Sequence, residues 1–177
     1  MVTTSVTAQV QYSGWVASFN TFRINKDFSL HFDAQVRSTN HIDHVQTVLL
    51  RPGIIYHINK KLTATAGYAY IPNRRSAAGI TELVAEHRAW EQLLLAQKAG
   101  KVSIAHRRRF EQRFIPKVHA EGDQLKVDEY AHAYRLRYFT RAVIPLTGKQ
   151  PFNKGCFAAL QDEVFANTGN TSAVNGK

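Results

Sequence analysis

The chain of 177 residues is poor in the residues that cross-link or interrupt small domains, with one cysteine, Cys156, and five prolines. A single cysteine excludes an intrachain disulfide framework. Charged residues make up only 20% of the chain, against 44% hydrophobic and 11% aromatic residues, which excludes a disordered basic tail. The aliphatic runs are short, such as residues 93–96, whereas a helix needs about 18 to 20 apolar residues to cross a bilayer. The composition therefore leaves one folded domain and excludes a bundle of transmembrane helices.

Signatures of catalysis and metal binding are equally scarce. The chain has no GxSxG motif, no HExxH motif and no glycine-rich phosphate loop. Glu86 and Glu111 could pair across neighbouring strands as an acid–base dyad, but the arginines around them favour permanent ionisation. His41 and His44 flank Asp43, yet zinc needs three or four ligands and no partner cluster is evident. We therefore predict no enzymatic activity, no metal site and no cofactor.

The net charge of +10 would ordinarily point to nucleic acid or an anionic membrane. The basic run at residues 107–109 lies in an alternating segment, which divides its charges between two faces. A stacking platform for bases needs aromatic and cationic side chains on the same face. By parity, however, Tyr134 and Tyr138 oppose Arg135 and Arg137. We therefore predict no nucleic-acid partner.

The dominant pattern is an alternation of apolar and polar residues. In residues 28–37, every second side chain is apolar and those between are polar, a pattern that a pleated strand sorts onto two faces. The alternation predicts about eight strands of about 10 to 15 residues, long enough to cross a bilayer when tilted. They are expected at about 15–24, 28–37, 45–58, 62–71, 82–96, 102–114, 130–144 and 157–166. A helix over 82–98 is the alternative for the fifth segment, which is rich in helix formers.

The connections between these strands alternate in length. Tight turns are expected at 25–27, 59–61 and 98–101, and longer polar loops at 38–44, 72–81 and 116–129. Short turns at one end and long loops at the other are typical of outer-membrane barrels. The connection 146–155 breaks this rule because it should be short.

The sequence divides into three parts. Residues 1–8 are interpreted as a signal-peptide remnant or a lead-in strand, and residues 9–167 as a β-barrel domain. Residues 168–177 form a polar tail, after which the closing strands are expected to be missing.

Several motifs, in this order and spacing, resemble those of the DUF2490 family of uncharacterised bacterial outer-membrane β-barrel-like proteins. They are RPGIIY at 51–56, GYAYIPN at 67–73, EHRAWEQL at 86–93, RRRFEQRF at 107–114, YRLRYFTRAVIPL at 134–146 and DEVFAN at 162–167. The resemblance covers roughly residues 15–167. It implies an outer-membrane barrel and carries over no catalytic residue.

On the predicted strands, seven arginines and four glutamates point away from the apolar face. They are Glu82, Glu86, Arg88, Arg107, Arg109, Glu111, Arg113, Arg135, Arg137, Arg141 and Glu163. In a barrel this face lines the lumen. The set is interpreted either as a structural network of Arg–Glu pairs or as a weakly anion-attracting site.

The fold class predicted is all-β, an antiparallel up-and-down meander of about eight strands that forms an outer-membrane-type barrel, either complete or lacking its closing strands. The function predicted is that of a barrel in the bacterial outer membrane, with membrane lipid as its partner. A soluble lipocalin-like barrel that binds a small ligand is the alternative, and a lipid-acting barrel enzyme is a weaker one. Trp90 is placed either in an interfacial girdle or inside the barrel. Glu91 and Arg108 fall on the lipid face and are therefore expected near a rim.

Overall fold

The structure, a computed structural model, describes residues 12–39, 42–147 and 154–169 as one eight-stranded antiparallel sheet. The strands pair in chain order, which confirms the all-β meander. They are β1 (Trp15–Arg23), β2 (Phe28–Ser38), β3 (Val45–His57), β4 (Leu62–Ala77), β5 (Ile80–Ala99), β6 (Val102–Glu121), β7 (Gln124–Pro145) and β8 (Phe157–Gly169). The alternative of a helix over 82–98 is wrong, because these residues lie within β5.

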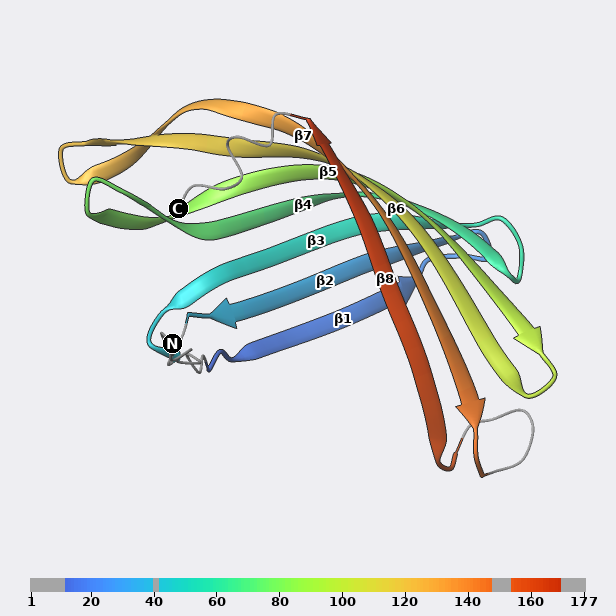
Figure 1. Cartoon of the computed structure of the whole chain (residues 1–177). Helices are drawn as coiled ribbons and strands as arrows, with labels where there is room; N and C mark the ends of the chain where they lie inside the picture. Colours follow the sequence, from blue (N-terminus) through green and yellow to red (C-terminus); the bar gives the residue numbers. More distant parts are fainter. Residues whose placement is uncertain (1–11, 40–41, 148–153, 170–177) are drawn as a thin grey trace, which may run out of the picture.

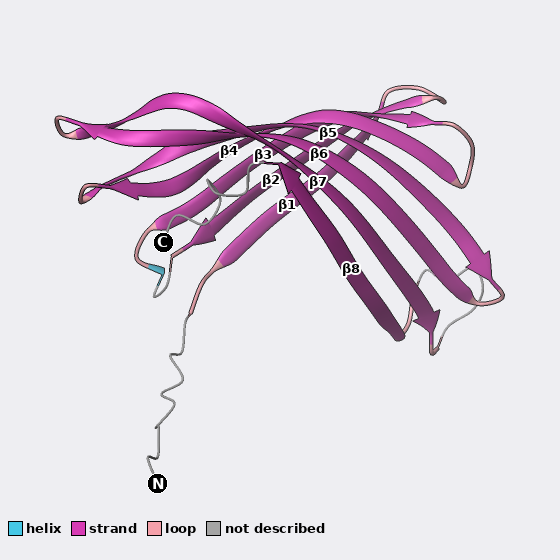
Figure 2. Cartoon of the chain, turned by 45° about the horizontal axis from the view of Figure 1, so that its top comes forward, coloured by secondary structure: helices cyan, strands magenta, loops and turns pink. Residues whose placement is uncertain are grey.

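The sheet is strongly twisted and curved, with β1 and β8 as its two edges (Figures 1 and 2). Within the described residues these two strands are not paired with each other, so the sheet is not closed. Side chains from β1 and from β7 nevertheless line one recess, so the sheet curls around a sheltered inner face. In the same part of the chain, no helix is long and apolar enough to cross a membrane.

The expected loops at 72–81 and 116–129 are wrong, because both segments form the ends of long hairpins. Ala78 and Gly79 have φ values of 48° and 84° and make a two-residue turn between β4 and β5. Gly122, with φ of 60°, begins the equivalent turn between β6 and β7. The strands continue through these polar residues because ladder hydrogen bonds form there whatever the side chains are.

Exposed ion pairs also join the two strands of the β6–β7 hairpin tip. Lys117 Nζ lies 2.5 Å from Glu129 Oε1, and His119 Nδ1 lies 2.6 Å from Asp128 Oδ1. Such pairs contribute little individually. They keep this tip polar on both faces, unlike the rest of the sheet.

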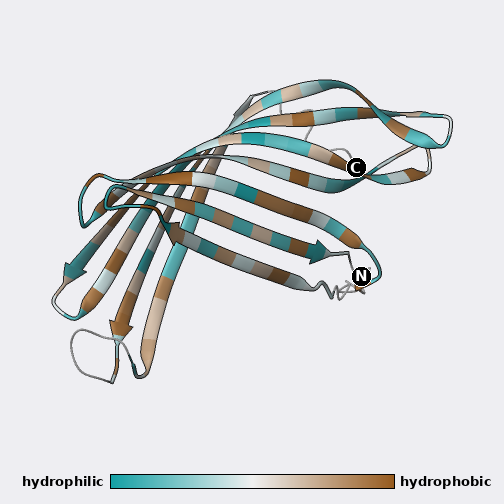
Figure 3. Ribbon diagram, turned by 180° about the vertical axis from the view of Figure 1, so that it is seen from behind, coloured by the Kyte–Doolittle hydropathy of each residue, from teal (hydrophilic) through white to brown (hydrophobic). Residues whose placement is uncertain are grey.

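The two faces of the sheet have inverted polarity, and Figure 3 shows the alternation of hydrophilic and hydrophobic residues along the strands. On β2, Ser29 and Asp33 are 1% and 0% exposed, whereas the intervening Leu30 is 44% exposed. Exposed large apolar side chains continue across the outer face on the other strands, including Ile54, Tyr68, Leu93, Phe110, Leu136 and Val164. Period-two alternation therefore places polar groups inside and apolar groups outside.

The inner face also holds a small apolar core around Trp90, which is 2% exposed and clusters with Ala69 and Ile71. Gly53 and Gly67 make room for the indole ring. A Cβ at Gly67 would lie 2.6 Å from Trp90 Cζ2, and one at Gly53 would lie 2.9 Å from the same atom. Trp90 thus lies inside rather than in a girdle.

The predictions for the two chain ends fall mainly outside the described residues. Residues 1–8 are not described, and the proposed tail is described only for Thr168 and Gly169, which end β8.

Candidate functional site

The inner face carries a network of ion pairs built around the buried carboxylate of Glu86. Arg113 donates to it from β6 through Nε at 2.7 Å and Nη2 at 3.2 Å. Arg88 Nε donates to the same carboxylate at 2.7 Å. The cross-strand pairing of Arg88 with Arg113 brings both guanidinium groups to one side of Glu86.

A second group of contacts extends the network through β6, β7 and β8. Glu111, 2% exposed, lies 3.1 Å from Arg88 Nη1, 3.4 Å from Arg137 Nη1 and 3.9 Å from Arg109 Nη1. Glu163 of β8 binds Arg137 at 2.5 Å and Arg107 at 2.9 Å. The ladder of antiparallel pairs places these residues on one face, as their parity predicts.

The structure therefore joins eight of the eleven predicted luminal residues by ion pairs and leaves three outside these pairs. Arg135 lies beside the network, where its Nε donates to Asn167 Oδ1 at 2.7 Å. Glu82 lies toward the β4–β5 turn and accepts from the backbone N–H of Leu125 at 3.2 Å. Arg141 is exposed, near the opposite end of β7.

Sequence reasoning missed one part of the site, an ion pair between Arg51 of β3 and the fully buried Asp33 of β2. Gln35 Nε2 donates to both Asp33 oxygens, at 2.9 and 3.1 Å. Asp33 shares the polar parity of residues 28–37 and could have been found from that signal. Arg51 was harder to find because Leu49 and Ile55 share its face and blur the alternation.

Two arginines from different strands also meet the buried indole of Trp90. The Arg109 guanidinium lies 4.9 Å from the ring centroid, and that of Arg51 lies 5.8 Å from it. Both distances are within the range of cation–π attraction. Arg109 is also held by Gln92 Oε1, which accepts from its Nε at 3.1 Å and from its Nη2 at 2.7 Å.

These side chains surround an open recess of about 450 Å³ on the inner face, here called the arginine recess. Seven arginines line it, and no Asp or Glu of the described residues does so. The seven are Arg37, Arg51, Arg88, Arg107, Arg109, Arg135 and Arg137.

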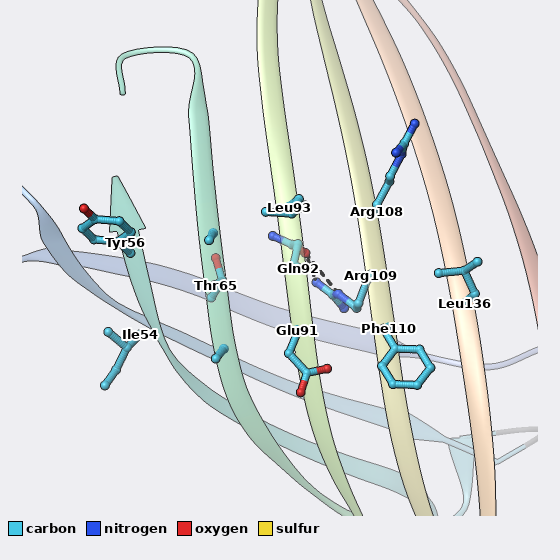
Figure 4. A pocket seen from close by; sticks show the side chains of 12 residues that line it. Ile54, Tyr56, Thr65, Glu91, Gln92, Leu93, Arg108, Arg109, Phe110 and Leu136 are labelled. Atoms are coloured by element: carbon cyan, nitrogen blue, oxygen red, sulfur yellow. Dashed lines mark hydrogen bonds between the residues drawn. The ribbon is translucent and has the colours of Figure 1, made fainter. Parts of the chain in front are cut away.

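A second recess, of about 490 Å³, lies on the outer face and is almost entirely apolar. Figure 4 shows Glu91, Leu93, Phe110 and Leu136 around it, together with the hydrogen bond between Gln92 and Arg109. Ala64, Thr65 and Ala66 of β4 also line this recess.

The chemistry of the inner site is electrostatic. A carboxylate held between guanidinium groups stays ionised and is a poor proton donor. Within the described residues, no group of three or more His, Cys, Asp or Glu side chains could hold a metal ion. His41 lies outside the residues that the structure describes.

Comparison with known proteins adds the family. No curated protein and no solved structure matches the chain. The model of the family described as protein of unknown function (DUF2490) matches residues 12–177, which include every strand of the sheet and every residue of the ion-pair network. The chain belongs to the DUF2490 family.

Proposed function

We propose that this protein is a β-barrel of the bacterial outer membrane, with lipid against its apolar face and the ion-pair network in its lumen. The observation that carries the proposal is the inverted polarity of the sheet. Asp33, Glu86 and Glu111 are at most 2% exposed, while Leu136 and Ile54 of the other face are 56% and 55% exposed. Water would favour the opposite arrangement, whereas lipid around a polar lumen favours this one.

Aromatic side chains on the outer face support the proposal because they form two rows. The first row lies toward the β4–β5 and β6–β7 turns. There the centroid of the His87 ring lies 5.7 Å from that of Tyr70 and 5.6 Å from that of Tyr130. We call this row, together with Tyr68, Phe114 and His132, the hairpin-side girdle.

The second row lies toward the short turns. There the Tyr138 hydroxyl and His106 Nδ1 are hydrogen-bonded at 2.8 Å. With Phe28 and Tyr56, whose rings are 5.2 Å apart, they form the short-turn girdle.

The spacing of the two girdles is close to the height of a membrane's apolar band. On β5, the row of Phe28, Tyr56 and Tyr138 crosses at Leu93, six residues from His87, and His106 pairs with Leu95, eight residues from His87. The girdles are therefore about 20 to 26 Å apart along the strand at about 3.3 Å per residue. A strand tilt of about 40° reduces this to a height of about 15 to 20 Å. The apolar band of an outer-membrane barrel is about 25 Å tall, and the outer membrane is thinner than average.

Two charged residues of the outer face take different places relative to these girdles. Arg108 pairs with Tyr138 and thus falls in the short-turn girdle of the proposed barrel. Glu91 instead falls four residues from His87 and four from Leu95, near the middle of the band. Its Oε1 accepts from Gln112 Nε2 at 3.3 Å, which partly compensates the carboxylate.

A soluble lipocalin-like barrel would need an apolar cavity and a polar exterior. The two faces described here have the reverse distribution, which is why we favour the membrane. In the proposed barrel, the edges of β1 and β8 are joined to each other or through further strands, since an open sheet edge is not tolerated in lipid.

Detergent dependence tests the proposal. The full chain, unfolded in urea, is diluted into buffer with and without lauryldimethylamine oxide micelles. We expect β-sheet circular dichroism with micelles and aggregation without them. Unheated folded samples should also migrate differently from heated ones in SDS gels. A monomeric, folded chain in buffer without detergent would overturn the proposal.

A further inference from the structure

The arginine recess contains more positive charge than its carboxylates neutralise. Six arginines share four carboxylates. Asp33 binds Arg51, and Glu86 binds Arg88 and Arg113. Glu163 binds Arg107 and Arg137, and Glu111 lies near Arg88, Arg109 and Arg137. Two further arginines, Arg37 and Arg135, have no carboxylate within ion-pair distance among the described residues. The ion-paired residues and these two arginines thus combine eight arginines with four carboxylates.

The buried carboxylates of the network do not line the recess. Asp33, Glu86 and Glu111 are at most 2% exposed, whereas the lining carries arginines. Two guanidinium nitrogens there, Arg51 Nε and Arg137 Nε, are buried and lack a hydrogen-bond partner. A buried donor without a partner costs free energy, so the protein itself does not fully satisfy these two guanidinium groups.

The two unpaired arginines are held in place by neutral groups. Arg135 donates to Asn167 and lies 5.4 Å from the Phe165 ring centroid. Arg37 lies 4.9 Å from the Trp15 ring centroid. Their positions are therefore fixed without using up their charge, so both remain available to an anion.

We infer that the arginine recess binds a phosphate group, either free or carried by a small molecule or a lipid. Planar guanidinium forks match phosphate oxygens in pairs, and the surplus of four positive charges favours a dianion over a single carboxylate. The recess of about 450 Å³ is larger than phosphate alone needs, and Phe19, Leu49 and Ile71 add apolar lining for an attached organic part. The inference needs only the sheltered inner face and not the membrane, so it can fail separately from the proposed function.

Binding is tested with the folded full chain in micelles, titrated at constant ionic strength and followed by tryptophan fluorescence. Trp90 reports directly, because it touches Arg51 and Arg109. The probes are inorganic phosphate, glucose 6-phosphate, dihexanoyl phosphatidic acid and chloride. At least one phosphate probe should bind with a Kd below about 10 mM, and chloride should not. Tighter binding of the phosphatidate supports a lipid headgroup, and tighter binding of the sugar phosphate supports a soluble ligand.

Variants on one strand separate the site from general electrostatics. Arg135→Gln removes an unpaired recess arginine without orphaning a carboxylate, whereas Arg141→Gln removes the same charge from an exposed site on β7. We expect Arg135→Gln to weaken phosphate binding about tenfold and Arg141→Gln less than twofold. Arg37→Gln provides a second recess variant at an exposed residue. Equal losses for Arg135→Gln and Arg141→Gln, or no preference for phosphate over chloride, would overturn the inference.

Discussion

Replacing Leu136 by arginine tests whether the outer face of the sheet contacts hydrocarbon. The Leu136 side chain is 56% exposed and pairs with Phe110, which in turn pairs with Glu91. This row lies four residues from His87 and four from Leu95, about 13 Å along the strands. The substitution is best made in a chain that also carries Glu91→Gln. Without the Glu91 carboxylate, the new arginine at position 136 has no carboxylate among the residues paired across these three strands.

The expected loss follows from this depth. An arginine at the middle of a bilayer costs a barrel about 2 to 4 kcal/mol, which lowers the folding equilibrium constant about 30- to 900-fold. At a water-exposed site the same change usually stays within about 0.5 kcal/mol. Val127 is the matched control, since it is 39% exposed on the same strand but lies in the polar β6–β7 tip. Val127→Arg should cost at most about 1 kcal/mol.

The assay is urea unfolding of each variant in phosphatidylcholine vesicles, followed by the fluorescence of the two tryptophans, of which Trp90 is buried. The free energies of unfolding are compared with that of the parent background. If Leu136→Arg and Val127→Arg have the same effect within about 0.5 kcal/mol, this face does not lie in hydrocarbon and the argument from inverted polarity is refuted.

Three further predictions concern the inner face and the hairpin tip. Glu111→Gln should cost about 3 to 5 kcal/mol in urea unfolding, because it removes a buried carboxylate from three arginines and leaves Arg109 without a carboxylate among the described ion pairs. Glu82→Gln, outside these ion pairs, should cost less than about 1 kcal/mol. Gly67→Ala should lower stability by about 1 to 3 kcal/mol in the same assay, because its Cβ would lie 2.6 Å from a buried indole. In the tip, the hydrogen bond from Lys117 holds the pKa of Glu129 below its ordinary value near 4.5. The stabilisation from this pair is therefore complete above that pH and is lost as pH falls through the lowered pKa. NMR titration should show this midpoint, and Lys117→Met should return it to the ordinary value.

Alternation was enough to predict most of the fold, because a strand with one face in a polar interior has only one acceptable register. In β2 the predicted polar parity coincides with the buried residues Ser29, Asp33 and Gln35. Alternation failed at 72–81 and 116–129, where both faces are polar and the pattern cannot distinguish a loop from a hairpin tip. The Ala78–Gly79 turn gave only a weak signal, because alanine rarely takes the positive φ that it has here.

The candidate site was predictable as a face but not as a set of contacts. Parity assigned Arg107, Arg109 and Arg113 to one side, but it says nothing about distance along the strand. Glu82 and Arg141 share that side and lie beyond the ion-pair network. Which carboxylate meets which arginine depends on strand register and on the curvature that brings β3 near β6, and both are properties of the whole sheet.

The surplus on the inner face also accounts for part of the net charge of +10. A barrel interior that needed only to be filled could use one carboxylate for each arginine, since unpaired buried charge is costly. Here Arg37 and Arg135 are positioned by Trp15 and Asn167 instead. Neutral partners fix a guanidinium while leaving its charge uncompensated, which stabilises the sheet less than an ion pair would. Two guanidinium groups that face one recess and have no carboxylate partner there are the arrangement that an entering anion requires.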